Sequence, residues 1–531
     1  MAFEVIVIGS GFGGAITACR LAEAGMRVLI LERGRRWDRT SYPREPNDAW
    51  IWNRARPERE NGWVDLHVFE HMAVAAGAAV GGGSLIYANI SCEAPKSSFA
   101  GGWPPEITFD ELKPHYDTVA KFMNVQQVPD NQWTQRMKLM KASAEAIGAG
   151  DRFKKLDLAV SFDSNWTYDC KDPHNPAHSQ RFVNDQGVEQ GTCVHLGNCD
   201  IGCDVDAKNT LDRNYIPWAE RHGAVVRPLH LVTDIAPVDG GYRVSFDRLQ
   251  NGARVAGSET ARIVIVAAGS MGSTDLLLRC RDQNRSLPNI SPFLGRNWSS
   301  NGDFLTPAFY EQRPVDPSKG PTITCAIDFL DGSVDGQSFW VQDGGLPNLL
   351  GDALAGRRGL SLGDGARVRT VVESIRHMLL TGSDNPLGHV MPWFGQAVDG
   401  GGGVLSLQSA RFSNTPALSL DWDISKSLRA VQALIDTHQR LTKATGGHAV
   451  VPPTWSLFHY LVTPHPLGGC NMGVSPAAGV VDHRCEVFGY PNLYVCDGAV
   501  VPRAIGVNPS RTIGAIAERT AQLMVGKAAV V

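Results

Sequence analysis

The pattern of apolar positions at the start of the chain predicts a strand, a helix and a second strand in close succession. Residues 3–8 (FEVIVI) are rich in β-branched side chains, which is typical of a buried parallel strand. A glycine-rich turn follows, and a helical pattern then continues to about Ala24, where Gly25 ends it. Residues 27–31 form the second predicted strand. This order predicts a βαβ unit in a parallel sheet.

The rest of the chain alternates between helical and strand-like patterns. Helical periodicity predicts helices over residues 110–123, 135–147, 273–280, 424–444 and 511–525. Short apolar or alternating runs predict strands over residues 225–231, 242–246, 262–266, 321–330, 404–407, 418–422 and 492–496. The strand at 262–266 ends in a small-residue turn before a helix, like the opening unit. We therefore expect the chain to return to its first sheet after a long excursion.

These patterns predict an α/β fold, α+β overall, with two domains that are both discontinuous in sequence. We expect a Rossmann-type nucleotide-binding domain over residues 1–100, 205–305 and 460–531. A substrate domain of strands and helices would comprise residues 101–204 and 306–459. At 531 residues the chain is too long for a single core, which agrees with two domains.

Composition and charge narrow the class of protein. The net charge is −4 and no basic patch stands out, which argues against nucleic acid as a partner. No apolar run of about 20 residues predicts a transmembrane helix, and the strand at residue 3 leaves no room for a secretory signal. The 11 cysteines are scattered, as in reduced proteins. We therefore expect a cytoplasmic protein.

The glycine-rich turn after the first strand predicts a dinucleotide site. Its glycines are Gly9, Gly11, Gly13 and Gly14, and Glu32 ends the second strand 23 positions after Gly9. Gly9 would permit the tight turn, Gly11 would let the backbone approach a pyrophosphate, and Gly14 would let helix and strand pack closely. An acid at this distance binds a ribose hydroxyl, and the helix N-terminus attracts phosphate. The alternative is a glycine turn that only connects strand to helix.

Two further segments could hold ligands. A second glycine turn spans residues 77–85 and contains Gly81, Gly82 and Gly83, which would permit close approach of a flat or charged ligand. The Cys193, Cys199 and Cys203 cluster suggests a metal site, but its spacing matches neither a paired CxxC zinc site nor an iron–sulfur run. We predict no metal there.

The last part of the chain carries the candidate chemistry. His465 begins the sequence HPLGGC, and Asp497 and Gly498 follow a strand at the edge where ligands bind in open α/β sheets. Asn508 and Pro509 precede the last helix, where they fit the N-cap and first helical positions. Capping alone would explain Asn508 and Pro509.

The sequence resembles the glucose–methanol–choline family of flavin oxidoreductases, and within it the cholesterol oxidase branch. The resemblance covers most of the chain and is carried by GSGFGG at 9–14, VGGGSL at 80–85, AKNTLDRNYI at 207–216, AAGSMGSTDLLLR at 267–279, HPLGGC at 465–470 and residues 492–519. It implies FAD rather than NAD, held without a covalent bond, because nothing around His71 demands a flavin link. It also implies that His465 and Asn508 are the catalytic pair.

The resemblance assigns cofactor and substrate residues position by position. The implied FAD-binding residues are Gly9, Gly11, Phe12, Gly13, Gly14, Glu32, Gly81, Gly82, Gly83, Ser84, Asn89, Val232, Asp497, Gly498, Asn508 and Pro509. Cholesterol oxidases use a glutamate for isomerisation, and residues 388–393 contain none here. Our best alignment puts His389 near that position, with Trp393 and Phe394 also beside the substrate.

The resulting expectation is oxidation of a secondary hydroxyl on a bulky apolar alcohol, steroid-like, with hydride transfer to flavin N5 and His465 as base. Two alternatives remain open: the same chemistry on a sugar or glycoside, and a lyase that uses FAD structurally. The electron acceptor, O2 or another carrier, and the oligomeric state are not encoded in any motif.

Overall fold

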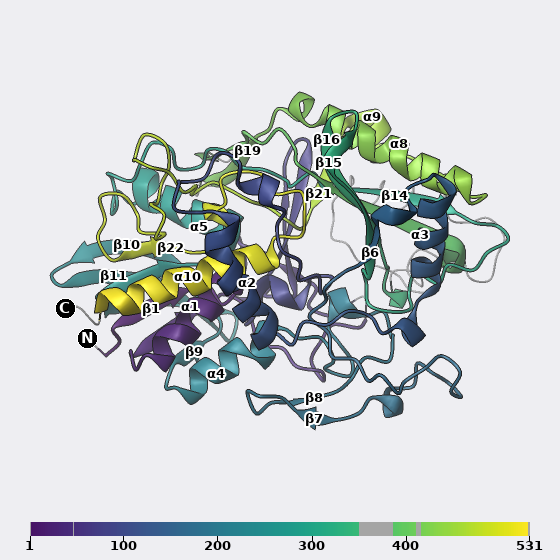
Figure 1. The fold of residues 1–531 in the computed structure, drawn as a ribbon. Helices are drawn as coiled ribbons and strands as arrows, with labels where there is room; N and C mark the ends of the chain where they lie inside the picture. Colours follow the sequence, from purple (N-terminus) through teal and green to yellow (C-terminus); the bar gives the residue numbers. More distant parts are fainter. Residues whose placement is uncertain (1, 46, 350–385, 410–415, 529–531) are drawn as a thin grey trace.

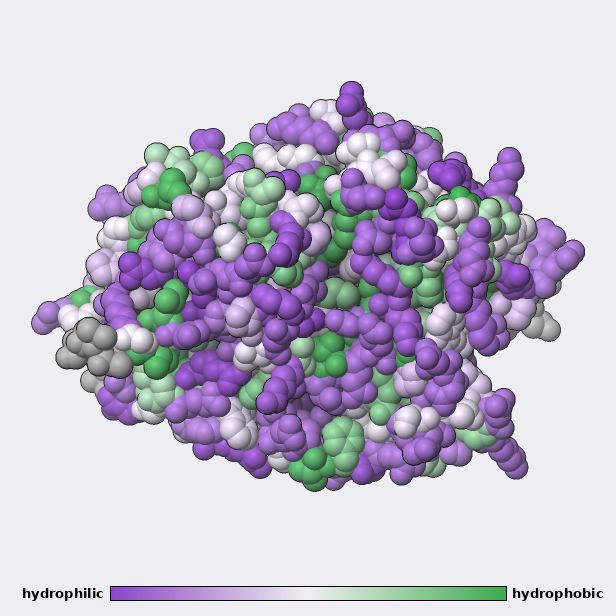
Figure 2. Space-filling view, viewed as in Figure 1, coloured by the Kyte–Doolittle hydropathy of each residue, from purple (hydrophilic) through white to green (hydrophobic). Residues whose placement is uncertain are grey.

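The computed structural model describes residues 2–45, 47–349, 386–409 and 416–528. Its helices are α1 (Phe12–Glu23), α2 (Phe109–Phe122), α3 (Gln135–Ala146), α4 (Tyr215–Arg221), α5 (Gly269–Leu278), α8 (Leu428–Ala444), α9 (Pro453–Phe458) and α10 (Ser510–Ala528). Among these residues no helix is long and apolar enough to cross a membrane. The face in Figure 2 is mainly hydrophilic, with hydrophobic side chains in small scattered groups.

A five-stranded parallel sheet forms the centre of the nucleotide-binding part. Its strands are β22 (Leu493–Val495), β13 (Ile263–Val266), β1 (Val5–Ile8), β2 (Val28–Leu31) and β9 (Val225–Arg227), in that spatial order. All four residues of β1, β2 and β13 are buried, as expected for a sheet covered on both faces. The predicted return of the chain to its first sheet is therefore confirmed.

Helices α1 and α10 pack against each other beside this sheet, although they lie at opposite ends of the chain (Figure 1). Helix α2 packs against α10 from the other side. Arg20 of α1 binds Glu518 of α10 through Nε at 2.8 Å, which ties the two terminal segments together. The N-terminal βαβ unit and the C-terminal helix thus form one body.

The second large element is a six-stranded antiparallel sheet. Its strands are β20 (His448–Ala449), β14 (Phe304–Phe309), β17 (Val390–Ala397), β16 (Gln337–Asp343), β15 (Cys325–Val334) and β6 (Phe153–Lys155). Helix α8 covers one face of it, where Trp393 Nε1 donates to Thr442 Oγ1 at 2.8 Å. The opposite face is directed toward His465. Of these strands, the sequence analysis predicted β15 alone, shifted by several residues.

Smaller sheets complete the fold. A three-stranded antiparallel sheet contains β10 (His230–Val238), β11 (Gly241–Gln250) and β12 (Ala253–Ala261). A four-stranded sheet contains β21 (Leu461–Thr463), β5 (Met72–Gly77), β4 (Val64–Val68) and β3 (Ile51–Trp52). Two strand pairs join β18 (Val404–Gln408) to β19 (Ala417–Asp421) and β7 (Phe182–Val183) to β8 (Glu189–Gln190). The predicted α/β class is confirmed, whereas the residue boundaries of the two domains stay a prediction.

Candidate active site

A cavity of about 570 Å³ lies between the parallel sheet and the six-stranded sheet. The carboxyl ends of β1 and β2, both glycine turns and the start of α10 line it on one side. On the other side it is lined by Leu305 and Phe394, which pair across β14 and β17, and by residues that follow β16. The cavity therefore sits where α/β sheets bind ligands and where a second sheet can add specificity.

The first glycine turn is shaped by close backbone packing. Gly9 has φ +96°, and a Cβ there would collide with the carbonyl of Ala267. A Cβ on Gly13 would overlap the carbonyl of Cys496, and one on Gly14 that of Gly9. At Gly11 the nearest atom would be 4.0 Å away, at Gly82. Gly9, Gly13 and Gly14 thus pack the turn, while Gly11 leaves open backbone on the cavity.

Glu32 is held rigidly at the end of β2. Its carboxylate accepts hydrogen bonds from Ser10 N at 3.0 Å, Ser10 Oγ at 2.7 Å and Gly34 N at 2.8 Å. The side chain is buried yet lines the cavity, beside Phe12 and, from β10, Val232. This end of the cavity also carries Arg33 and Arg54.

The second glycine turn packs directly on the first. Gly81 and Gly82 have φ of +101° and +52°, and a Cβ on Gly82 would lie 2.6 Å from Gly11 Cα. Gly82 and Gly83 line the cavity. Ser84 instead ties the turn, since its Oγ donates to Gly81 O and accepts from Leu211 N. The two turns together present bare backbone to a ligand.

Asn89 provides a test of whether a cofactor fits this cavity. The residue is fully buried with φ +68°, and neither amide atom has a hydrogen-bond partner among the described residues. Its neighbours Ala88 and Ile90 line the cavity. A buried amide without partners costs about 1–3 kcal/mol. A polar ligand group beside Asn89 would remove that cost, so the residues present fit a bound dinucleotide cofactor.

Asp497 lines the cavity and connects two of its turns. Its carboxylate accepts from Gly269 N at 2.8 Å, Ser273 Oγ at 2.5 Å and Ala499 N at 2.7 Å. Burial raises the pKa of Asp497 above its usual value. Gly498 and Pro509 line the cavity beside it. Asp497 therefore joins the turn after β13 to the turn after β22.

His465 and Asn508 meet in the cavity, as expected. His465 Nε2 lies 3.2 Å from Asn508 Nδ2, and the Asn508 oxygen accepts from Gln342 Nε2 at 2.8 Å. Helix α10 begins at Ser510, two residues after Asn508. The Asn508 oxygen is held instead by the Gln342 side chain of β16. This corrects the expectation that Asn508 caps the helix. Because Gln342 takes the oxygen, the Asn508 NH₂ group must face His465.

A carboxylate that the sequence analysis missed holds the other side of the imidazole. Asp303 Oδ1 and Oδ2 lie 2.9 and 3.0 Å from His465 Nδ1. Asp303 is 1% exposed and also accepts from Thr463 Oγ1 at 2.5 Å. Gln396 Nε2 lies 2.9 Å from the same Nδ1, while Trp340 fixes the Gln396 oxygen. The carboxylate is the stronger acceptor, so we assign the Nδ1 proton to Asp303 and leave Nε2 as acceptor.

The three substrate residues expected near 389–394 separate in the structure. Phe394 lines the cavity, with its ring 6.3 Å from that of His465. Trp393 points to the opposite face of β17, toward α8, because successive strand residues alternate. His389 lies just before β17, where its Nδ1 donates to the carbonyls of Tyr310 and Arg313. His389 and Trp393 are outside the described cavity lining, which corrects their expected place beside the substrate.

Gln342 and Gln396 could have been recognised as polar residues at the inner end of apolar strand runs, SFWVQ and MPWFGQ. Asp303 had no such local signal. The described lining does not include His71, the nearest candidate for a covalent flavin link.

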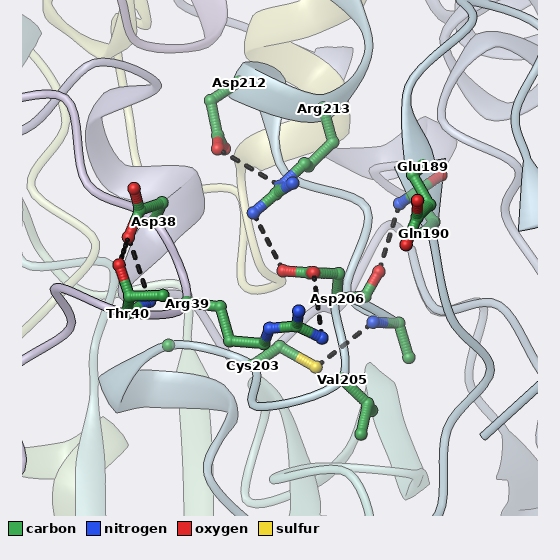
Figure 3. A network of polar contacts seen from close by, with 12 residues as sticks. Asp38, Arg39, Thr40, Glu189, Gln190, Cys203, Val205, Asp206, Asp212 and Arg213 are labelled. Atoms are coloured by element: carbon green, nitrogen blue, oxygen red, sulfur yellow. Dashed lines mark hydrogen bonds and ion pairs between the residues drawn. The ribbon is translucent and has the colours of Figure 1, made fainter. Parts of the chain in front are cut away.

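Cys203, from the cysteine cluster, takes part in a polar network. Cys203 Sγ accepts from Ala207 N at 3.2 Å, beside Asp206, which lies between Arg213 and Arg39 (Figure 3). Within the described residues, no group of three or more His, Cys, Asp or Glu side chains could hold a metal ion. Burial raises the pKa of the Cys203 thiol to about 11.

Comparisons with known proteins agree with this architecture. A family profile described as GMC oxidoreductase matches residues 401–517, and one described as NAD(P)-binding Rossmann-like domain matches residues 7–41. A cholesterol oxidase of Acinetobacter baumannii is 31% identical over 551 residues, covering 97% of this chain and 93% of the relative. A cholesterol oxidase of Mycobacterium tuberculosis (strain ATCC 25618 / H37Rv) is 32% identical over 547 residues, covering 99% and 91%.

Among solved structures, pyridoxine 4-oxidase from Mesorbium loti superposes with a TM-score of 0.63 at 16% identity, covering 98% of this chain and 99% of that one. At this identity the likeness concerns the fold alone. The near-full-length relatives above 30% identity carry the assignment, and they confirm the resemblance seen in the sequence. The chain belongs to the GMC oxidoreductase family of FAD-dependent alcohol oxidoreductases.

Proposed function

We propose that this enzyme oxidises a secondary hydroxyl on a bulky, largely apolar alcohol of steroid type to the ketone, with His465 as base. The observation that carries the proposal is the ordered chain Asp303, His465, Asn508, Gln342 at the cavity wall. The apolar residues Leu305, Ile323, Leu346 and Phe394 line the same region. The two relatives named cholesterol oxidase support a sterol-like substrate.

When bound, FAD would supply the acceptor for the hydride that leaves the alcohol carbon. Gly11, Gly82 and Gly83 would hold it through backbone, Glu32 through its carboxylate, and Asn89 and Asp497 nearby. Since His71 is absent from the described lining, we propose non-covalent binding. The N-terminus of α10 presents positive potential to the cavity through Pro509 and Ser510, which stabilises negative charge there.

The protein's own contribution is proton transfer and orientation. The lone pair of His465 Nε2, which faces the Asn508 NH₂ group, accepts the hydroxyl proton as the C=O bond forms, and Asp303 stabilises the resulting imidazolium. The second N–H of Asn508 donates to the substrate oxygen. Gln342 keeps the Asn508 amide in the orientation that makes this possible. As electron acceptor we propose O2, which fits the relatives named oxidases.

Flavin bleaching under anaerobic conditions tests this function. The holoenzyme is mixed with a sterol, a long-chain alcohol or a sugar, and the oxidised flavin absorbance is followed. We expect the sterol to bleach the flavin fastest and air to restore the colour. A flavin that stays oxidised with all alcohols would favour the lyase alternative.

A sugar or glycoside is the second candidate. Weaker relatives are named paromamine 6'-oxidase, at 25% identity, and fructose dehydrogenase large subunit, at 24%. The cavity also carries the polar side chains of Asp200 and Thr322. Faster bleaching by a sugar than by the sterol would favour this candidate over ours.

A further inference from the structure

Asp200 and Thr322 lie in the cavity wall but have no part in the proposed chemistry. Thr322 is 6% exposed and lines the cavity, yet its hydroxyl has no hydrogen-bond partner among the described residues. Asp200 also lines the cavity. The Thr322 hydroxyl lies near enough to lower the pKa of Asp200, against the larger effect of burial. A buried hydroxyl and a carboxyl group side by side in a cavity wall can both form hydrogen bonds with a polar group of a ligand.

This pair belongs to the substrate side of the cavity. Thr322 precedes Ile323, and a Cβ on Gly345 would lie 2.8 Å from Thr322 O. Gly344, Gly345 and Leu346 follow β16, the strand that carries Gln342. The charged lining residues of the nucleotide side, Glu32, Arg33 and Arg54, belong to other elements. The other acidic residues of the described lining, Glu32 and Asp497, follow β2 and β22, whereas Asp200 lies beside Thr322.

Both halves of the pair are held rigidly from behind. Arg136 is fully buried, donates to Thr322 O at 3.0 Å and to Pro321 O at 2.7 Å, and pairs with Asp343 at 3.2 Å. Lys208 Nζ donates to Cys199 O at 2.7 Å and to Leu85 O at 2.9 Å. It thereby fixes the turn that carries Asp200 against the second glycine turn. The pair is thus a built site rather than a loop surface.

Charge at the pair favours a donor as partner. Burial raises the pKa of Asp200 to about 6, and the nearby Lys208 opposes this rise. At neutral pH the group is therefore mainly a carboxylate, which accepts hydrogen bonds but cannot donate them. The Lys208 ammonium donates to the carbonyl oxygens of Leu85 and Cys199. A substrate hydroxyl or ammonium is the complementary group.

We propose that Asp200 and Thr322 form a specificity subsite that binds a second hydrogen-bond donor on the substrate, remote from the hydroxyl that is oxidised. This inference rests on the proposed alcohol oxidation. Gly345, whose Cβ would lie 2.8 Å from Thr322 O, follows Gln342 by three residues, or roughly 10 Å at extended spacing, which places the subsite at about that distance from the His465 end of the cavity. The preferred substrate is therefore a rigid or long alcohol, apolar in the middle, with a hydroxyl or amine at its far end.

The test compares three probes of one steroid skeleton: a diol with hydroxyls at opposite ends, the mono-ol without the remote hydroxyl, and the amino-alcohol with a remote amine. Anaerobic stopped-flow reduction of the holoenzyme gives the apparent Kd and the limiting rate. Binding of the ketone products, followed by flavin difference spectra, gives a second readout without turnover. We expect the diol or the amino-alcohol to bind at least about 10-fold more tightly than the mono-ol.

Two variants identify the residues. Thr322→Val keeps the side-chain shape and should remove most of the preference for the diol. Asp200→Asn keeps an acceptor but loses the charge, so it should weaken the amino-alcohol more than the diol. The limiting rate with the mono-ol should not change in either variant. Thr324→Val is the matched control, because the Thr324 hydroxyl donates to Asp343.

The outcomes separate the subsite from the chemistry. Equal Kd values for the three probes in the natural enzyme, or an unchanged preference in both variants, would overturn the subsite while the oxidation stands. No flavin bleaching by any probe would overturn the proposed function itself. If the preference for the amino-alcohol is lost only in Asp200→Asn, the remote group that the subsite binds is an amine. If the preference for the diol is lost in Thr322→Val, that group is a hydroxyl.

Discussion

At the scale of single residues, the site is organised around one imidazole whose two nitrogens have different partners. Asp303 lies at Nδ1 and the Asn508 amide at Nε2 of His465. A histidine with this arrangement can accept a proton at one nitrogen only. The orientation of the Asn508 amide that faces Nε2 depends on Gln342, which is outside the described cavity lining and donates to the Asn508 oxygen.

We expect His465→Ala to retain FAD and to slow flavin reduction by about 10²- to 10⁴-fold, the usual contribution of a positioned base. Anaerobic stopped-flow reduction measures the rate, and the ratio of flavin to protein absorbance measures retention. His389→Ala is the matched control, since that imidazole bonds carbonyls away from the cavity and should leave the rate nearly unchanged. Near-normal reduction by His465→Ala would remove the proposed base.

Asp303→Asn should lower the limiting rate on the order of 10²-fold, because an amide can hold the imidazole in the wrong tautomer. The apparent Kd for the alcohol should change little. Asp399→Asn provides the control: that carboxylate is also buried and bonds Ser299 and Ser300, close in sequence to Asp303. If Asp303→Asn and Asp399→Asn lose the same fraction of the rate, Asp303 has only a structural role.

At the scale of elements, the two glycine turns act as one cradle. A Cβ on Gly82 would lie 2.6 Å from Gly11 Cα, so the packing of the two turns depends on the absence of a side chain at Gly82. Strand alternation then decides which residues of the six-stranded sheet reach the site. Phe394 and Gln396 point toward His465, whereas Trp393, the residue before Phe394, points to α8.

Gly82→Ala should reduce FAD occupancy severely, since its Cβ would meet Gly11 Cα at 2.6 Å and the φ of +52° is strained for alanine. Gly252→Ala is the comparison, because Gly252 also has positive φ (+73°) in the turn between β11 and β12 but has open space around it. Flavin content after purification measures the effect. Full occupancy in Gly82→Ala would contradict the close approach of the turns.

At the scale of the whole molecule, buried histidines couple stability to pH. His195 stacks on Trp166, and the buried His438 of α8 contacts Thr306 Oγ1 through its Nδ1. Burial lowers the pKa of each to about 3. Below pH 6.5 the unfolded chain gains protons that the folded protein does not bind, so stability decreases as pH falls from about 6.5 toward 3.

At pH 5 this effect amounts to about 2 kcal/mol for each histidine. In His438→Gln the loss of stability between pH 7.5 and pH 5 should therefore shrink by that amount, whatever the variant's stability at neutral pH. Urea unfolding of the holoenzyme at the two pH values checks this. The exposed His448 gives the control variant His448→Gln, and an equal pH dependence in all three proteins would refute the assignment.

The sequence by itself determined those parts of the protein whose physical requirements are local. Strand β1, helix α1 and strand β2 were predicted within two residues, because an apolar run, a glycine turn and a helix stop are read from adjacent positions. The glycines of the first turn likewise predicted a tight backbone turn between strand and helix. His465 and Asn508 were found through their motifs, and the structure brings them together.

Tertiary structure alone decided which distant residues complete the site. Asp303 lies 162 positions before His465, and no local pattern links a carboxylate just before β14 to an imidazole just after β21. The error at Trp393 has the same origin, because only the packing of α8 decides which face of β17 is turned to the cavity. Asp200 and Thr322 come together for the same reason. Their chemistry depends on burial and neighbours, which arise only when the two sheets close around the cavity.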